Sequence, residues 1–382
     1  MNHFIYTLFS GAALLLAFLL IANPNKVNNK GNWWFGWFVL CLFMVTVGDS
    51  LQITHVDLNE NIVNLISLAA FIIAPVFYLS VCYFIEPGRK WKKTDFLHFG
   101  FGFVMLLLTL LLMLVDNSKY QKTTHSETDQ IVGVIFNLIC FFQLIQYVIV
   151  SYRKIVKHRK NILYFASSVE SVDLKWLQYI GVGVASMSFI WALEILFQLS
   201  GKSVVYDTFS NLIYLINVLF IAYYSMKQKE IYPFDAKVQD EIMDIVWETE
   251  LPLENRKKLL PDDKLEETKA ELIDLMDSKK PFLDCELSLV KLADLMNTST
   301  HLLSYVINTG FNENFYQFVN RYRIEESKKL LLDPNMNHLS LVGIGYEVGF
   351  NSKTVFNTTF KKMTEFTPTE FKKTSNRFIS AN

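Results

Sequence analysis

The chain has 382 residues and a formal net charge of −1, and 51% of the residues are hydrophobic, 15% aromatic and only 19% charged. This composition excludes a single ordinary soluble core, because the apolar residues are concentrated in the first 226 positions and indicate a membrane segment there. The near-neutral total hides a local excess of cations, since residues 315–382 carry 10 basic and 6 acidic side chains. The four cysteines show no spacing typical of a disulfide framework or a metal site.

Seven apolar runs in the first half are long enough to cross a bilayer, which takes about 20 helical residues. The predicted spans are residues 4–22, 33–55, 60–85, 96–115, 131–152, 177–199 and 207–226. The segment before the first run has no Lys or Arg, and no small-residue cleavage pattern follows it. We therefore expect this run to be a retained span rather than a signal peptide.

The distribution of Lys and Arg between the loops predicts the orientation of these spans. The loops after spans one, three and five carry 12 of these residues, whereas the alternate loops carry three. Because cytoplasmic loops are enriched in Lys and Arg, the N-terminus is expected outside and everything after Lys227 in the cytoplasm.

Two ionisable residues stand out inside the predicted spans, Asp49 late in the second and Glu194 late in the sixth. Ionisable groups in hydrocarbon are costly and mark candidate functional sites. The predicted outer side has eight acidic residues and three lysines, which favours an outward-opening acidic vestibule for a cationic or hydrogen-bonding ligand. Asp49 and Glu194 are the candidate ligand-sensing residues. The alternative is that both lie at the headgroup level or are protonated and bonded to neighbours.

A polar segment, residues 227–283, follows the last span and is predicted to be a cytoplasmic linker with a connector helix. Asp262 or Asp263 can cap this helix, which should run to about Ser278. Its apolar positions recur at helical spacing and form one apolar face. The partner of that face is either the neighbouring domain or a second copy of the chain.

Residues 284–382 show the pattern of two helix-turn-helix motifs joined by a longer helix that ends before Pro334. In the first motif Ser299 can cap the second helix. In the second motif Gly349 is the expected turn and Ser352 the cap of the last reading helix. The apolar residues expected in the two reading helices' buried faces are Leu303, Val306, Ile307, Phe356 and Phe360.

Residues 264–375 resemble the AraC/XylS family of bacterial transcription regulators. The resemblance is carried by Asn320, Arg321, Tyr322, Arg323, Ile324, Leu331, Ile344, Val348, Gly349, Phe350, Ser352, Phe356, Phe360, Lys361, Lys362, Thr367, Pro368 and Phe371. Three positions depart from the family's usual pattern: Gly345 replaces Ala, Glu365 replaces a turn glycine, and Lys372 replaces Arg. The whole chain resembles, less specifically, membrane-bound regulators of Bacteroidetes type that join a seven-span half to this domain.

The reading helices present their solvent-facing side chains to the major groove of DNA. The candidate DNA-binding residues are His301, Ser304, Tyr305, Asn308, Ser352, Lys353, Thr354, Asn357, Thr358, Lys361 and Lys362. Arg321 and Arg323 are further candidates for phosphate contacts, although the resemblance implies that they can be structural. The first reading helix has no Lys or Arg, so we expect it to contribute less electrostatic affinity than the second.

The predicted fold is all-α: a seven-transmembrane-helix bundle, residues 1–226, then the linker, residues 227–283, and an AraC-type domain, residues 284–382. The predicted function is a one-component transcriptional regulator in the bacterial inner membrane, controlled by a seven-span sensor. Its expected partners are promoter DNA and the lipid bilayer, with RNA polymerase, a second copy of the chain and a small-molecule or peptide ligand as further candidates.

Other classes of protein lack support in the sequence. No metal-spaced cluster, paired catalytic carboxylates or Gly-rich phosphate loop is found, so neither an enzyme nor a cofactor is predicted. The alternative is a membrane transporter or channel with a regulatory cytoplasmic domain. Truncation after Met226 separates the two, because a transporter should retain its flux.

Overall fold

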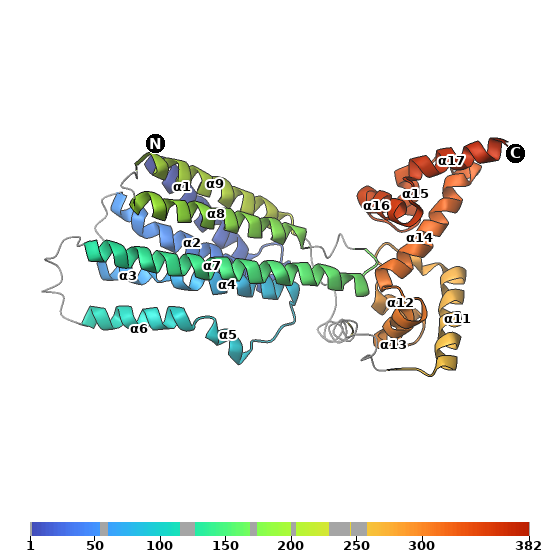
Figure 1. Cartoon of the computed structure of the whole chain (residues 1–382), viewed down its shortest axis with the longest axis horizontal. Helices are drawn as coiled ribbons and strands as arrows, with labels where there is room; N and C mark the ends of the chain where they lie inside the picture. The colour runs from blue at the N-terminus through green and yellow to red at the C-terminus, as the bar shows by residue number, and fades with distance from the viewer. Residues whose placement is uncertain are drawn as a thin grey trace. The chain divides into compact units, whose positions relative to one another are not determined.

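The computed structural model describes residues 2–53, 60–114, 127–168, 174–199, 204–228, 245 and 258–381. Its regular secondary structure is entirely helical in these ranges, which confirms the predicted all-α class. The chain divides into two compact units (Figure 1). The apolar unit comprises Met1–Lys157 and Leu174–Ile231, and the C-terminal unit comprises His158–Asp173 and Tyr232–Asn382.

The apolar unit is a bundle in which α1 packs against α2 and α9, α2 against α4, and α8 against α9 (Figure 1). Its helices are α1 (Asn2–Ala22), α2 (Asn29–Ile53), α3 (Glu60–Ser67), α4 (Ala69–Ile85), α5 (Lys93–Leu97), α6 (Gly100–Leu114), α7 (Glu127–Asn161), α8 (Lys175–Leu199) and α9 (Val204–Met226). The predicted third span is divided at Leu68, where two backbone bonds of the i to i−3 type form a tighter turn.

Five helical stretches of the described residues are long and apolar enough to cross a membrane. They are Phe4–Ala22, Ile62–Ile85, Val134–Tyr164, Lys175–Phe197 and Thr208–Met226. A sixth apolar stretch, Gly100–Leu111, is shorter. The predicted second span is helical in α2 but is not one of the five.

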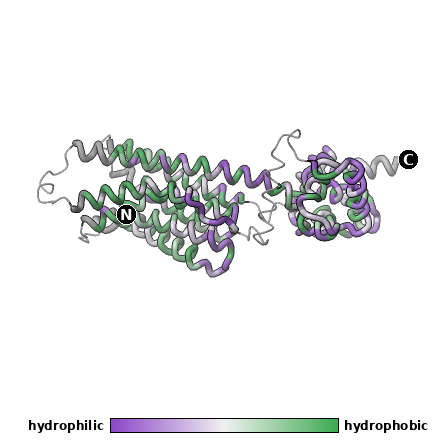
Figure 2. Tube along the Cα trace, turned by 90° about the horizontal axis from the view of Figure 1, so that it is seen from below, coloured by the Kyte–Doolittle hydropathy of each residue, from purple (hydrophilic) through white to green (hydrophobic). Residues whose placement is uncertain are grey.

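Large apolar side chains cover the outside of the apolar unit. Phe4, Phe18, Phe142 and Phe209 are each between 65% and 72% exposed. The helices of this unit are mainly hydrophobic along their length, whereas the C-terminal unit mixes hydrophobic and hydrophilic residues (Figure 2). Exposed aromatic surface on this scale indicates a partner that is itself apolar.

The long helix α14 joins the two helix-turn-helix motifs of the C-terminal unit, and both motifs pack against it. Its α-helices are α11 (Asp262–Lys279), α12 (Leu289–Leu295), α13 (Thr300–Tyr305), α14 (Phe315–Leu332), α15 (Leu341–Glu347), α16 (Lys353–Thr364) and α17 (Pro368–Ala381). Its described residues also form the short turns η4 (Pro281–Leu283), η5 (Val306–Gly310), η6 (Pro334–Met336) and η2 (Ile162–Tyr164).

The described residues of the unit form two hydrophobic cores, one at each motif. The first core joins Leu272 and Met276 of α11 to Leu292, Val306 and Phe318. The second core gathers residues from α14 to α16. The apolar face of the connector helix α11 therefore packs onto the first motif of the same chain.

The expected helix caps are present at both reading helices. The Ser299 hydroxyl accepts a hydrogen bond from the backbone N–H of Leu302, and the Ser352 hydroxyl accepts one from Val355. The connector helix differs from the prediction, because Pro261 occupies its cap position without a side-chain bond. Asp262 and Asp263 instead lie in the first turn, where negative charge favours the helix dipole.

The departures Gly345 and Glu365 have opposite structural effects. A Cβ at Gly345 would lie 2.8 Å from the Phe356 ring, so glycine allows this ring to pack against α15. Glu365 ends α16 in the left-handed region, with a φ of 67°. A side chain in that region costs about 1 kcal/mol relative to glycine.

We predict that Glu365→Gly stabilises the end of α16 by about 0.5–1 kcal/mol, because glycine reaches this φ without steric cost. Hydrogen exchange of the α16 amides, measured by mass spectrometry on the whole chain in detergent, should slow by about two- to fivefold. Glu365→Ala is the matched control, since it removes the carboxylate but keeps the Cβ. Equal slowing in both variants would show that the φ is not the cause.

Candidate nucleic-acid interface

The second helix-turn-helix motif has a sharp turn at Gly349 between α15 and α16. Its φ is +93°, and a Cβ there would lie 2.5 Å from the carbonyl oxygen of Phe282 and 2.9 Å from that of Leu283. Only glycine allows this approach. The turn of the second motif thus packs directly against η4, although η4 precedes α14 in the sequence and the turn follows it.

The second reading helix, α16, presents most of the predicted residues to solvent. The exposed ones are Lys353, Thr354, Thr358, Lys361 and Lys362, and Asn357 is partly exposed. Phe356 and Phe360 are 1% and 0% exposed and fix the rotation of the helix on its core. The residues that face solvent therefore form one polar, cationic stripe.

Ser352 and Thr358 make hydrogen bonds to the backbone of α16, and these bonds determine which of their atoms can contact DNA. Ser352 is half-buried and is used as the cap of α16. The Thr358 hydroxyl donates to the carbonyls of Thr354 and Val355, which leaves its methyl group and oxygen lone pairs outward. Such a methyl group is suited to a thymine methyl contact.

The first reading helix presents fewer of its predicted residues. It is α13 followed by the π-helical turn η5. The prediction that Ser304 faces solvent is wrong, because it is 4% exposed, and the Asn308 amide donates to its hydroxyl and carbonyl oxygens. Tyr305 is partly buried against the first core, and His301 is half-exposed. His301, Tyr305 and Asn308 are therefore the predicted residues of this helix that remain partly exposed.

Arg321 is held in an ion pair on the surface of α14. Its Nε lies 3.0 Å from Glu313 Oε1 and its Nη2 3.1 Å from Oε2, and the guanidinium stacks over the Tyr322 ring. This bidentate geometry positions α14 against the segment that precedes it. The interpretation of Arg321 as a phosphate contact is therefore not supported by its place in the unit.

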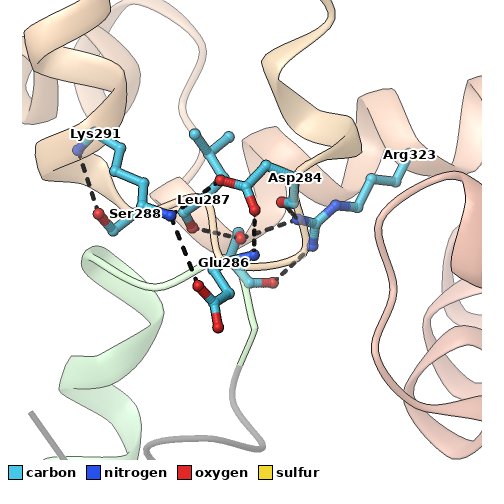
Figure 3. A network of polar contacts seen from close by, with 7 residues as sticks. Asp284, Glu286, Leu287, Ser288, Lys291 and Arg323 are labelled. Atoms are coloured by element: carbon cyan, nitrogen blue, oxygen red, sulfur yellow. Dashed lines mark hydrogen bonds and ion pairs between the residues drawn. The ribbon is translucent and has the colours of Figure 1, made fainter. Parts of the chain in front are cut away.

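Arg323 is a buried structural residue, so its interpretation as a phosphate contact is wrong. It is 1% exposed. Its Nε donates to the carbonyl of Phe282 at 2.7 Å. Its Nη2 donates to the carbonyl of Asp284 at 2.8 Å, and Figure 3 shows these two residues side by side. The remaining donors reach the Ser167 carbonyl at 3.1 Å, the Ser167 hydroxyl at 3.1 Å and the Asn320 amide oxygen at 3.3 Å.

All of these acceptors are neutral oxygens, so the cation is stabilised by dipoles rather than by a direct carboxylate bond. Burial lowers the pKa of Arg323 to about 10, which leaves it charged at neutral pH. Its guanidinium also lies 5.6 Å from the centre of the Phe350 ring, in the turn of the second motif. One side chain thus contacts both halves of the C-terminal unit.

The apolar unit contains a cavity of about 430 Å³. Its polar lining residues are Tyr6, Thr46, Ser188, Glu194, Ser210, Asn211 and Tyr214. The Tyr214 hydroxyl donates to Glu194 Oε2 at 2.9 Å, so this candidate sensing residue is bonded to another lining residue of the cavity. Asp49 belongs to α2, but its side chain lies outside the described part of the chain.

The fold and the exposed cationic helix are those of a helix-turn-helix domain, and the family match in this part of the chain is of the AraC type. Residues 292–374 match the helix-turn-helix domain family HTH_18. A protein of Pseudoalteromonas carrageenovora, described as an uncharacterized HTH-type transcriptional regulator in the cgkA 5′ region, is 46% identical over 52 residues. That alignment covers 14% of this chain and 28% of the relative. No solved structure matches the chain.

We predict that Arg323→Lys destabilises the C-terminal unit by about 2–3 kcal/mol. A lysine ammonium group cannot reach all the oxygens that the guanidinium bonds, so some buried oxygens are left without a hydrogen bond. Hydrogen exchange of the α14 amides in the whole chain measures this loss. Arg321→Lys is the control and should cost about 0.5–1 kcal/mol, since its pair is partly exposed. Unchanged protection together with weaker DNA binding would instead assign Arg323 to the phosphate backbone.

Proposed function

We propose that the protein is a membrane-bound transcriptional regulator, in which the C-terminal unit binds promoter DNA and the apolar unit lies in the bacterial inner membrane as a sensor. The observation that carries the DNA-binding part is the exposed stripe of α16, mounted on an AraC-type helix-turn-helix domain. Sequence-specific recognition needs donors and acceptors that face the groove together with cations for the phosphates.

The residues of α16 divide into these two kinds of contact. Asn357 has the amide that pairs with adenine, and Thr354 and Thr358 are suited to thymine methyls or phosphates. Lys353, Lys361 and Lys362 supply phosphate contacts, which fix the register of the domain on the duplex. The first motif, with no Lys or Arg on its reading helix, adds contacts through His301, Tyr305 and Asn308.

The five long apolar stretches and the exposed aromatic surface support the membrane location of the apolar unit. With the seven spans predicted from the sequence, the excess of Lys and Arg in alternate loops supports an outer N-terminus and a cytoplasmic C-terminal unit. RNA polymerase and a second copy of the chain are the partners proposed for the regulatory step. Dimerisation would raise the avidity for adjacent half-sites.

We predict that the whole chain in detergent binds selected genomic DNA fragments with an affinity that falls steeply with salt. Asn357→Ala should weaken binding to the preferred site by about 1–3 kcal/mol, and Lys361→Ala should lower the salt slope by about 1. Electrophoretic shifts over a salt series measure both effects.

Lys264→Ala is the matched control for this experiment, because its lysine lies on the exposed surface of α11 and pairs with Glu267. It should change neither the affinity nor the slope. If no fragment is preferred, the C-terminal unit is a protein adaptor instead.

The sensor part of the proposal rests on the cavity of the apolar unit. Glu194 is an acidic group in a mainly apolar wall, so the cavity is suited to an apolar small molecule or peptide side chain that carries a cationic or hydrogen-bonding group. A ligand acts only if it binds one conformation better than the other. The connector helix α11, which packs on the first motif, is one element that such a change can move.

We predict that Glu194→Gln raises the amount of signal required for half-maximal transcription by about tenfold or more, because a hydrogen bond to a charged group contributes about 1.5–3 kcal/mol. Transcripts of the bound promoter, measured across growth conditions, give this value. Asp49→Asn tests the second candidate in the same way. Glu86→Gln, at the end of α4, is the control. Unchanged output from both variants would remove the ligand-sensing role.

A further inference from the structure

The C-terminal unit contains a segment that does not come from the C-terminal half of the chain. Residues 158–168 follow the apolar part of α7 and precede α8, so in the proposed topology they form the cytoplasmic loop between the fifth and sixth spans. They nevertheless belong to the compact unit that carries the two helix-turn-helix motifs.

Apolar side chains of this segment complete the first core. Ile162, Phe165 and Ala166 are 0%, 3% and 9% exposed and belong to the same cluster as Leu287, Leu289 and Phe318. Within the described residues, η2 also packs against α14. Removing the segment would expose these apolar side chains and part of the core beneath them.

The backbone of the segment pairs with the strand-like residues before α12. Ala166 and Ser288 form an isolated antiparallel bridge. The Ser167 N–H donates to the Leu287 carbonyl at 3.3 Å, and the Leu289 N–H donates to the Phe165 carbonyl at 2.9 Å. The segment passes beside the backbone of Leu287 and Ser288 in Figure 3.

Ser167 also supplies two of the acceptors of Arg323, its carbonyl and its hydroxyl. The Asn320 amide donates to the same carbonyl at 3.4 Å. Without Ser167, a buried guanidinium would lack two of its bonds, and an unpaired buried donor is costly. Apolar burial, backbone pairing and the buried cation therefore all favour the docked segment.

We propose that residues 158–168 are a docking segment by which the apolar unit holds the DNA-binding domain at a second point, in addition to the connector. The surface that receives it is formed by Leu287, Leu289, Asn320 and Arg323. Because α7 leads directly into the segment, a movement of α7 reaches α14 through Arg323 without passing along the connector. Cleavage of the connector alone does not release the domain.

The test of this proposal rests on the membrane location proposed above but not on DNA binding. A specific protease site is inserted within residues 234–240 of the whole chain, and membranes containing it are digested to completion, treated with nuclease and washed with salt. The C-terminal fragment of the otherwise unchanged chain should remain in the membrane pellet. Phe165→Asp should move most of this fragment into the supernatant, because a carboxylate cannot occupy the core.

Lys160→Asp is the matched control, since it also introduces a carboxylate into the segment but at an exposed position. Its fragment should stay in the pellet. Sedimentation of the uncut chain checks the membrane location separately. Release of the fragment from the unchanged chain overturns the proposal, and so does retention of the Phe165→Asp fragment.

A cysteine pair tests the contact without a destabilising substitution. Ala166 and Ser288 are a non-hydrogen-bonded antiparallel pair. The Cα atoms of such pairs typically lie about 4.5 Å apart, which is within disulfide range. Ala166→Cys with Ser288→Cys, in a Cys285→Ser background, should join the two fragments after oxidation and cleavage. Ala166→Cys with Glu347→Cys, which places the second thiol on exposed α15, should not. Absence of the first cross-link overturns the proposal.

Discussion

The burial of the Arg323 cation is the constraint on which the C-terminal unit depends. A guanidinium removed from water is costly unless each donor finds an oxygen, and here the oxygens come from the Phe282 turn, Asp284, Asn320 and Ser167. These four positions lie on three segments of the chain: Phe282 and Asp284 are in and just after η4, Asn320 is on α14 with Arg323 itself, and Ser167 lies between α7 and α8. Their mutual arrangement is therefore fixed by the planar fork of one side chain, and α14 is fixed with them.

The same region determines how the second motif is attached. Gly349 approaches the Phe282 carbonyl so closely that no side chain fits, and Phe350 next to it packs over the Arg323 guanidinium. The turn between α15 and α16 is thus held against the segment that precedes the first motif. Two reading helices on one rigid framework suit adjacent half-sites, although only α16 carries exposed lysines.

Much of the candidate site is predictable from local sequence, and the exceptions have a common cause. The caps Ser299 and Ser352 and the buried faces of the reading helices depend on residues three or four positions apart. Whether a polar side chain such as Ser304 faces solvent depends on what packs beside its helix. An arginine at a given position can either contact phosphate or be buried in the domain. The helical periodicity of the sequence does not distinguish these two roles, so it could not assign one to Arg323.

The sequence by itself determined the helical class, the apolar first half, the uneven distribution of cations and the helix-turn-helix pattern, because each is contained in composition or in short-range spacing. Only the tertiary structure decided that Arg323 is a buried brace, that α11 packs on the first motif and that residues 158–168 enter its core. These contacts join positions such as Ser167 and Arg323, which are 156 residues apart. Such residues become partners only when the whole core packs around the buried charge, so short-range sequence patterns do not predict their contact.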